Sequence, residues 1–511
     1  MSSRTTRREF LRTLGLGVAA SATHQPLRTF AQDDTGLGKP NIVYILADDM
    51  GYGDPQCQST ASKIPTPHMD RLAEQGIRFT DAHSGSAVCS PTRYGLLTGR
   101  YCWRTSLKRG VLVPWDAPLI EPERLTVAQF LKQQGYDTAC IGKWHLGWEW
   151  PTTDGEPPKP GSHGDTVDFT KPIENGPTTR GFDYYFGTCV PNYPPYCFIE
   201  NDRTVGIPSV PKPDAMFGHP GPMLPGWTLE SILPALTERA VAYIHERAQS
   251  DQPFFLYFSL TAPHTPIVPV KPFLGTSEAG RYGDWVHQVD WTIGQVMAAL
   301  DAAGLVDDTL LICTSDNGSP ARNGENASGP VGSVLKETGH NPSDGLRGMK
   351  ADIWDGGHRV PFIARWPGRI ASGATSNALI CHTDFFATCA ALLGVTLPNN
   401  AAEDSYNILP ALLCKPAGTP VRDAVVHHSG NGSFAIRQGT WKLIMSLGSG
   451  GWTAPKDPEV PPGGPRGQLY DMERDLAEEH NLWLERPDVV ARLTALLEEY
   501  KAQGRSAPLR R

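Results

Sequence analysis

The stretch Asn41-Ile-Val-Tyr-Ile-Leu-Ala47, followed at once by Asp48 and Asp49, decides the fold of this chain. Its unbroken apolar run predicts a strand that is buried on both faces, as is typical of a parallel sheet. Ligand and catalytic sites of open α/β sheets lie at the carboxyl ends of the strands. The two carboxylates therefore stand where such a sheet is expected to carry a site.

The segments that follow alternate between helical and strand patterns. We predict helices over residues 67–76, 126–134, 228–247, 285–304 and 383–393, and strands over 138–142, 254–260 and 309–314. This alternation predicts an α/β domain over residues 38–415, with a large doubly wound sheet flanked by helices. Two stretches rich in Gly and Pro, 150–225 and 317–350, interrupt it, and long insertions of this kind are often functional.

The pattern changes after residue 416. Residues 433–445 predict a hairpin, 468–471 a further strand and 487–502 a terminal helix. These elements predict a smaller C-terminal α+β domain with an antiparallel sheet, spanning 416–511.

Residues 1–31 are typical of an export signal. Thr6-Arg7-Arg8-Glu9-Phe10-Leu11 fits a twin-arginine motif, and a short, weakly apolar stretch follows it. We therefore expect a bacterial protein that the twin-arginine translocase exports already folded, to the periplasm or beyond. The alternative is a basic disordered tail. No later segment is long and apolar enough to predict a transmembrane helix, so we do not expect an integral membrane protein.

The net charge and the spacing of the cysteines argue against a nucleic-acid-binding protein and against a zinc site made of cysteines. The chain carries a net charge of −8; residues 1–31 contribute five Arg and one Glu, or +4, which leaves −12 for the remainder. A chain this acidic is not expected to bind nucleic acid. The ten Cys are scattered without a CxxC pair, which argues against zinc ligation, and pairing of Cys189 with Cys197 stays open.

A second motif carries nucleophile chemistry. Residues 89–93 read Cys-Ser-Pro-Thr-Arg and residues 97–100 read Leu-Thr-Gly-Arg. Pro91 suits the first turn of a helix and Gly99 its end, so Cys89 is expected at a helix N-terminus, where backbone N–H groups favour an anion. Arg93 lies one turn along on the same face.

This pattern resembles the signature of the sulfatase family, and the resemblance runs from Asn41 to about Leu482. It implies an alkaline-phosphatase-like fold with a mixed sheet, and a sulfuric ester hydrolase activity. In that family a maturase converts the cysteine to formylglycine, whose aldehyde hydrate supplies the nucleophile. Cys89 matches that position.

Four oxygen donors follow the ends of two predicted strands: Asp48, Asp49, Asp316 and Asn317. Carboxylate and amide oxygens suit Ca²⁺ or Mg²⁺, and the absence of His and Cys ligands argues against zinc. The resemblance implies that these residues and the formylglycine oxygen at Cys89 bind Ca²⁺, with Mg²⁺ as the alternative.

The resemblance also assigns catalytic roles. Lys143 and Lys350 would bind sulfate oxygens, and Arg93 would orient the hydrate. One hydroxyl of the hydrate would attack sulfur while His264, with Lys350, protonates the departing alcohol. His145 would deprotonate the other hydroxyl, so that the hydrate collapses to the aldehyde and expels sulfate. Asp355, in a matching motif, could pair with a site cation or cap a turn.

For the substrate, the first long insertion offers aromatic residues from Tyr193 onward, next to polar side chains that suit a sugar. From it and from the opposite rim we predict substrate contacts by Asn201, Asp202, Arg203, His340, His358 and Arg359. Ordinary loop packing is the alternative. The pattern resembles bacterial exo-acting carbohydrate sulfatases related to galactosamine-6-sulfatases, which favours the 6-sulfate of a galacto-configured sugar. Many relatives are called arylsulfatases because they cleave aryl sulfates.

Two other functions compete. A phosphodiesterase or phosphatase of the same superfamily would use Ser or Thr as nucleophile and additional His ligands for two zinc ions. A non-catalytic protein that binds sulfated glycans would follow if Cys89 stayed unmodified.

Overall fold

The apolar run at the start of the chain forms the central strand of a large sheet. The computed structural model describes residues 36–159, 161–415 and 420–510, so the predicted signal at 1–31 lies outside the described residues. Strand β1 (Asn41–Asp48) is buried along its whole length. It pairs in parallel with β10 (Phe254–Pro263) on one side and β11 (Thr309–Ser315) on the other.

The sheet has ten strands in the order β13-β2-β12-β11-β1-β10-β4-β5-β6-β7. The core strand β4 (Asp137–Lys143) pairs in parallel with β10 and with β5 (Tyr184–Thr188). Antiparallel pairs of β12 (Phe362–Arg365) with β11, and of β5 with β6 (Ile199–Glu200), make the sheet mixed, as predicted. The remaining strands are β2 (Ile77–Phe79), β7 (Arg203–Thr204) and β13 (Ala374–Ser376).

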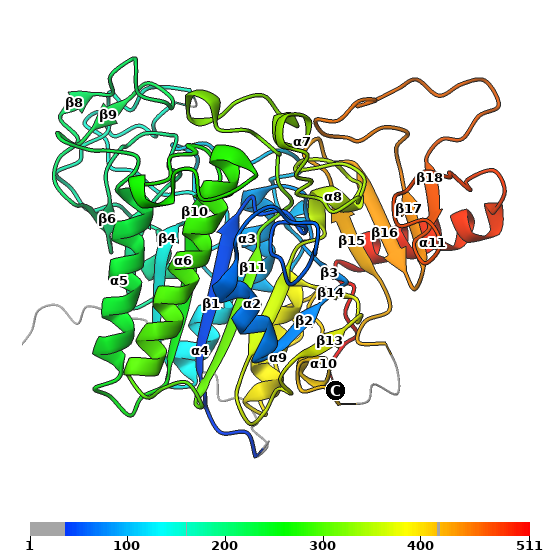
Figure 1. The fold of residues 1–511 in the computed structure, drawn as a ribbon, viewed down its shortest axis with the longest axis horizontal. Helices are drawn as coiled ribbons and strands as arrows, with labels where there is room; N and C mark the ends of the chain where they lie inside the picture. Colours follow the sequence, from blue (N-terminus) through cyan, green and yellow to red (C-terminus); the bar gives the residue numbers. More distant parts are fainter. Residues whose placement is uncertain (1–35, 160, 416–419, 511) are drawn as a thin grey trace, which may run out of the picture. The chain divides into compact units, whose positions relative to one another are not determined.

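Helices cover both faces of this sheet (Figure 1). On one face, α2 (Pro67–Glu74), α5 (Ile232–Arg247) and α6 (Gly280–Ala302) share one hydrophobic core with Val43 and Ile45 of β1. On the other face lie α3 (Cys89–Thr98), α4 (Val127–Gln133) and α9 (Phe385–Leu392), where the tilted rings of Phe385 and Tyr44 lie 4.7 Å apart. Side chains alternate along β1, so both faces of the strand are used, which explains its unbroken hydrophobicity.

Short elements fill the connections. The two insertions hold β8 (Val210–Pro211), β9 (Pro222–Met223) and α7 (Ser333–Thr338), while β3 (Ala82–His83), β14 (Ile380–Cys381), α8 (Asp355–His358) and α10 (Leu409–Leu412) lie elsewhere. Single 3₁₀ turns occur at Cys102–Arg104, Pro177–Arg180, Lys271–Phe273, Glu325–Ala327 and His382–Asp384. Among the described helices, none has the length and apolar character needed to cross a bilayer.

The C-terminal segment forms a separate antiparallel sheet. Its strands are β15 (Val425–His428), β16 (Phe434–Gln438), β17 (Trp441–Ile444) and β18 (Gln468–Asp471), and α11 (Pro487–Gln503) packs on β16 and β17. The hydrophobic core under this sheet includes Tyr101 and Trp103 from the segment after α3. The small sheet is therefore joined to the segment that carries Cys89 by shared apolar packing. The domain boundary at 415/416 stays a prediction.

Candidate active site

Four polar side chains meet at the carboxyl ends of β1 and β11. Asp48 ends β1 and Asp49 follows it, while Asp316 and Asn317 follow the parallel neighbour β11. The Asn317 amide donates to Asp49 Oδ1 at 2.7 Å, and the Asp49 backbone N–H donates to Asp316 Oδ1 at 3.1 Å. Asp49 adopts the left-handed backbone conformation, with φ 71°, which turns the chain at this point.

Cys89 is the first residue of α3, and Val88 before it is extended. The helix ends at Gly99 in the left-handed conformation, as the motif predicts. Cys89 Sγ lies 3.4 Å from Asp48 Oδ1 and 3.9 Å from Asp49 Oδ1. Burial raises the pKa of the Cys89 thiol, so an unmodified cysteine here stays a protonated, weak nucleophile.

Three cations balance the three carboxylates of the site. Lys143 Nζ is 2.7 Å from Asp48 Oδ2, and Lys350 Nζ is 2.6 Å from Asp49 Oδ1 and 3.5 Å from Cys89 Sγ. Arg93 Nη2 donates to Asp316 Oδ2 at 2.7 Å. Burial opposes ionisation of Asp48, yet the neighbouring cations, Lys143 foremost, hold its pKa well below the ordinary value. Burial, with the charge of Asp48, raises the pKa of Asp316 to about 6.

Two histidines line the cavity, and a different ring nitrogen in each is left without a carbonyl partner. His145 Nε2 donates to the Leu112 carbonyl at 2.8 Å, which leaves Nδ1 buried with no partner among the described residues. His264 Nδ1 donates to the Thr265 carbonyl at 2.6 Å, which leaves Nε2 facing Asp49 Oδ2 at 3.8 Å. Burial lowers the pKa of His145 well below its usual value, and burial with Lys350 lowers that of His264 to about 4. Both rings are therefore neutral and able to accept a proton.

The donor set fits a hard divalent cation. Asn317 Oδ1 is buried and, within the part of the chain that the structure describes, has no hydrogen-bond partner. It adds an amide oxygen to the carboxylates of Asp48, Asp49 and Asp316. One ligand atom from each of Asp48, Asp49, Cys89 and His264 lies within 4.8 Å of the others. The four oxygen donors Asp48, Asp49, Asp316 and Asn317 suit Ca²⁺ or Mg²⁺.

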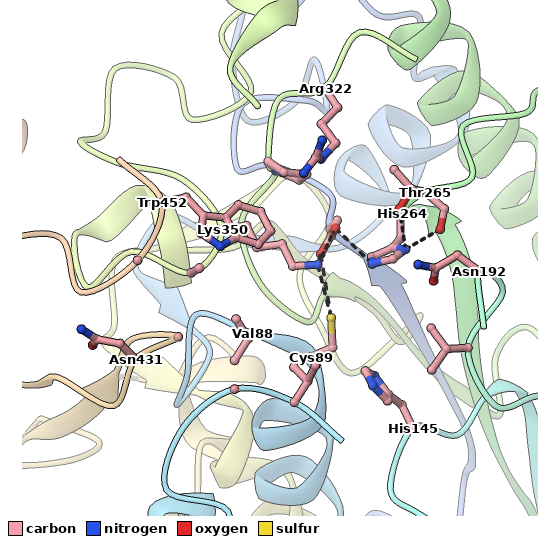
Figure 2. Close-up of a pocket in the computed structure, with 18 of the residues that line it drawn as sticks. Val88, Cys89, His145, Asn192, His264, Thr265, Arg322, Lys350, Asn431 and Trp452 are labelled. Atoms are coloured by element: carbon pink, nitrogen blue, oxygen red, sulfur yellow. Dashed lines mark hydrogen bonds and ion pairs between the residues drawn. The ribbon is translucent and has the colours of Figure 1, made fainter. Parts of the chain in front are cut away.

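A cavity of about 550 Å³ opens over these groups (Figure 2). Its lining includes five of the residues above: Asp49, Cys89, His145, His264 and Lys350. It also includes residues from both insertions and the C-terminal loops that the sequence did not single out as binding residues, namely Asn192, Tyr193, Arg322, Asn431 and Trp452. The sequence pointed to two of these residues only indirectly. Tyr193 is the first residue of the aromatic stretch in the first insertion, and Arg322 lies in the second insertion.

The structure places the predicted substrate contacts of the first insertion away from this cavity. Asn201 and Asp202 form the turn between β6 and β7, and Arg203 begins β7. Asn201 Oδ1 accepts from the Tyr185 N–H at 3.1 Å, and Arg203 Nη1 donates to the Thr170 carbonyl at 3.3 Å. None of the three lines the cavity, because the hairpin extends the far edge of the sheet.

His340, His358 and Arg359 are also placed outside the cavity lining. His340 is fully buried and its Nε2 lies 2.8 Å from Asp54 Oδ1. His358 stacks on His427 at 3.8 Å between ring centroids, and its Nδ1 lies 3.1 Å from Nδ1 of His83. Their hydrogen bonds serve the packing of the fold.

Arg359 and Asp355 belong to a buried ionic network beside this histidine cluster. Arg359 donates from Nε to the Thr80 carbonyl at 2.9 Å and from Nη1 to Asp355 Oδ2 at 3.3 Å. Asp355 pairs with Lys442 at 2.7 Å. Asp355 therefore holds a cation, but that cation belongs to the C-terminal sheet and not to the catalytic site.

A helix N-terminus that presents residue 89 to paired carboxylates and cations defines an enzyme site for an anionic ester. The chain belongs to the sulfatase family: the family model described as Sulfatase matches residues 40–395. The protein is therefore a sulfuric ester hydrolase. Sulfatases generally use formylglycine and a divalent metal, and the oxygen cluster described above is a possible site for that metal.

Named relatives agree with this assignment. The chain is 35% identical to an N-acetylgalactosamine-6-O-sulfatase of Bacteroides thetaiotaomicron, over 92% of this chain and 95% of that protein. It is 32% identical to human arylsulfatase A, over 87% and 83%.

Solved structures agree as well. A structure from work on glycosaminoglycan metabolism by Bacteroides thetaiotaomicron superposes with a TM-score of 0.76 at 34% identity, covering 91% of this chain and 99% of that one. A Pseudoalteromonas sulfatase superposes with a TM-score of 0.70 at 25% identity, covering 93% and 92%. The fold is the alkaline-phosphatase-like fold of these sulfatases.

Proposed function

We propose that this sulfatase removes a sulfate ester from the end of a sulfated saccharide, and that the 6-sulfate of a galacto-configured sugar is preferred. The observation that carries the proposal is the cavity in front of Cys89, which combines the aromatic side chains Tyr193 and Trp452 with polar Asn192 and Asn431. Aromatic faces with nearby amides suit a sugar ring. The likeness to an N-acetylgalactosamine-6-O-sulfatase supports the regiochemistry.

The residues of the site have distinct tasks in this reaction. Formylglycine at position 89 supplies the nucleophilic hydroxyl. Lys143 and Lys350 bind sulfate oxygens and stabilise the charge that builds on them as the ester bond breaks. Their ion pairs with Asp48 and Asp49 fix both ammonium groups beside residue 89.

The two histidines transfer the protons in this reaction. His145 Nδ1, which is buried without a partner among the described residues, accepts the proton of the second hydroxyl of the hydrate, the one that does not attack sulfur, so that the hydrate collapses to the aldehyde and expels sulfate. Once the anionic ester is bound, His264 takes up a proton at Nε2 and, with Lys350 close by, gives that proton to the oxygen of the departing alcohol, because an alkoxide is a poor leaving group. Arg93, held by Asp316, keeps the hydrate oriented.

The metal in this proposal is Ca²⁺, with Mg²⁺ as the alternative. Asp48, Asp49, Asp316 and Asn317 would hold it together with residue 89, and it would neutralise negative charge next to the sulfate. Four side-chain oxygen ligands and no nitrogen ligand in this set favour the hard cations over zinc.

The proposal includes maturation and export. A formylglycine-generating maturase would modify Cys89 in the cytoplasm, and the twin-arginine translocase would then carry the folded enzyme to the periplasm or outside the cell. Substituting both Arg7 and Arg8 by lysine should retain the sulfatase in the cytoplasmic fraction, as measured by activity after cell fractionation. Equal export of this variant would contradict the route.

A panel of defined substrates tests the activity. Wild-type protein should release sulfate from N-acetylgalactosamine 6-sulfate faster than from 4-sulfated or gluco-configured sugars, while Cys89→Ala should release none. Cleavage of an aryl sulfate alone would refute the saccharide substrate. Faster cleavage of a phosphate ester than of any sulfate would favour the phosphatase alternative, and binding of saccharides without turnover would favour a glycan-binding protein.

A further inference from the structure

Arg322 is the lining cation that the catalytic groups do not use. It enters the cavity from the second insertion and lies across from Cys89, above Lys350 in the view of Figure 2. Among the residues that the structure describes, it makes no ion pair with a carboxylate, whereas Lys143, Lys350 and Arg93 are each paired with one. A partly buried guanidinium without a counter-ion is suited to bind an anion of the substrate.

Hydrogen bonds within its own insertion fix the orientation of this guanidinium. Arg322 Nη1 donates to the Gly329 carbonyl and, at 3.3 Å, to Ser328 Oγ, both in the same insertion. A side chain that is held in this way loses less entropy when it binds a ligand. Arg322 is therefore a preorganised binding group.

Trp452 forms the adjacent wall. Its ring centroid lies 5.8 Å from the Arg322 guanidinium carbon and 5.9 Å from Lys350 Nζ, and the residue is 39% exposed. An indole exposed to this degree beside two cations is available for stacking on a sugar ring. Figure 2 shows Trp452 and Asn192 on opposite sides of the cavity.

The loop that carries Trp452 is tied to the catalytic segment. Asp352, two residues after Lys350, accepts the Trp452 N–H at 2.7 Å and the Thr453 N–H at 3.1 Å. Gly451 allows this approach, because a Cβ there would lie 2.4 Å from backbone atoms of Ala351. The C-terminal sheet region thus sets a binding wall at a fixed place next to the sulfate site.

We propose that Arg322 and Trp452 form a subsite for a second anionic group, so that the preferred substrate is a saccharide that bears another sulfate or a carboxylate beside the ester that is cleaved. Trp452 stacks on the sugar ring, and Arg322 binds the second anion. This inference rests on the proposed saccharide sulfatase activity and deepens it, because it specifies the chemistry of the group next to the reacting ring.

Three substrates separate the possible anions: N-acetylgalactosamine 6-sulfate, its 4,6-disulfate, and the 6-sulfated sugar linked to glucuronic acid. For Arg322→Gln we expect kcat/KM to fall about 10- to 100-fold on whichever doubly anionic substrate wild type prefers, the range for losing a charge-assisted hydrogen bond. On the singly sulfated sugar and on an aryl sulfate the fall should be about threefold or less. Arg322→Lys should recover part of the loss.

Further variants separate stacking from charge. Trp452→Ala should lower kcat/KM about tenfold on all three saccharides, and Trp452→Phe much less, because an aromatic face is retained. Arg474→Gln is the matched control: its side chain is 86% exposed outside the cavity lining, and the variant should match wild type. Unfolding midpoints of all variants verify that they fold.

The outcomes are distinguishable. Equal losses for Arg322→Gln on every substrate, or no loss on any, would overturn the subsite while leaving the saccharide sulfatase intact. A wild-type preference for the singly sulfated sugar would do the same. Failure of wild type to cleave any saccharide while it cleaves an aryl sulfate would overturn both the subsite and the proposed function.

Discussion

Replacing Lys442 by methionine removes the cation from a buried network that joins the C-terminal sheet to the catalytic segment. Lys442 lies on β17 and is fully buried; its Nζ is 2.7 Å from Asp355 Oδ1 and 2.8 Å from Glu478 Oε1. Asp355 begins α8, five residues after Lys350. Breaking a buried pair by removing one partner costs about 3–5 kcal/mol, because a charge is left without compensation.

The loss should depend on pH, and Glu478 determines the sign. Burial, with the charge of Asp355 and against that of Lys442, raises the pKa of Glu478 to about 7 from an ordinary 4.5. The folded protein then keeps a proton that the unfolded chain releases, so the free energy of unfolding falls as pH rises from about 4.5 to about 7. Without Lys442 the pKa of Glu478 rises further, and the fall continues above pH 7.

The assay is the thermal unfolding midpoint at pH 5 and at pH 8. Lys442→Met should be destabilised at both values and more so at pH 8. The double variant with Glu478→Gln should recover stability at pH 8, since the uncompensated carboxylate is gone. Lys171→Met, which breaks a pair between an exposed lysine and Asp168, is the control and should cost about 1 kcal/mol or less. A loss below about 1 kcal/mol for Lys442→Met at pH 8, or one independent of pH, would refute this reasoning.

Two other predictions concern the catalytic strand and the metal. Gly142→Ala should give insoluble or inactive protein, because its Cβ would lie 1.7 Å from the Ser259 carbonyl oxygen on β10. Gly135→Ala is the control: Gly135 has a φ of 88° but no atom within 4 Å of the added Cβ, so the variant should cost only about 1–3 kcal/mol of backbone strain. Equal expression and activity of the two variants would contradict the clash at Gly142. Chelation should lower both activity and the unfolding midpoint, and Ca²⁺ at 100 times its Kd should restore about 2.7 kcal/mol. Asn317→Ala should weaken this calcium-dependent shift, and an unchanged shift would exclude Asn317 as a ligand.

The parts of the fold that the sequence predicts well are those encoded locally. The apolar run of β1 and the positions of Pro91 and Gly99 in α3 depend on neighbours in the chain, and the structure has these elements where they were expected. The meeting of Asp49 with Asn317 follows from parallel pairing of β1 with β11, which brings both strand ends to one edge.

The residues that line the substrate cavity could not be predicted from the sequence in the same way. Arg322 and Trp452 lie in segments without periodicity, and the backbone of Trp452 is held by Asp352, which lies one hundred positions earlier in the chain. His358 and Arg359 are the opposite case, since they were predicted as substrate contacts but lie outside the cavity lining. They stand in a motif that matches the family, but their partners, among them His427, are distant in sequence, so their structural role was not visible.

The identity of residue 89 in the mature protein is the central claim. Mass spectrometry of the tryptic peptide Phe79–Arg93, from active enzyme purified out of a bacterium with a formylglycine maturase, tests it most directly. We predict a peptide lighter than the encoded one by the mass of H₂S minus that of one oxygen atom, and resistant to thiol alkylation. A fully active sulfatase whose peptide carries an intact, alkylatable Cys89 would contradict the account.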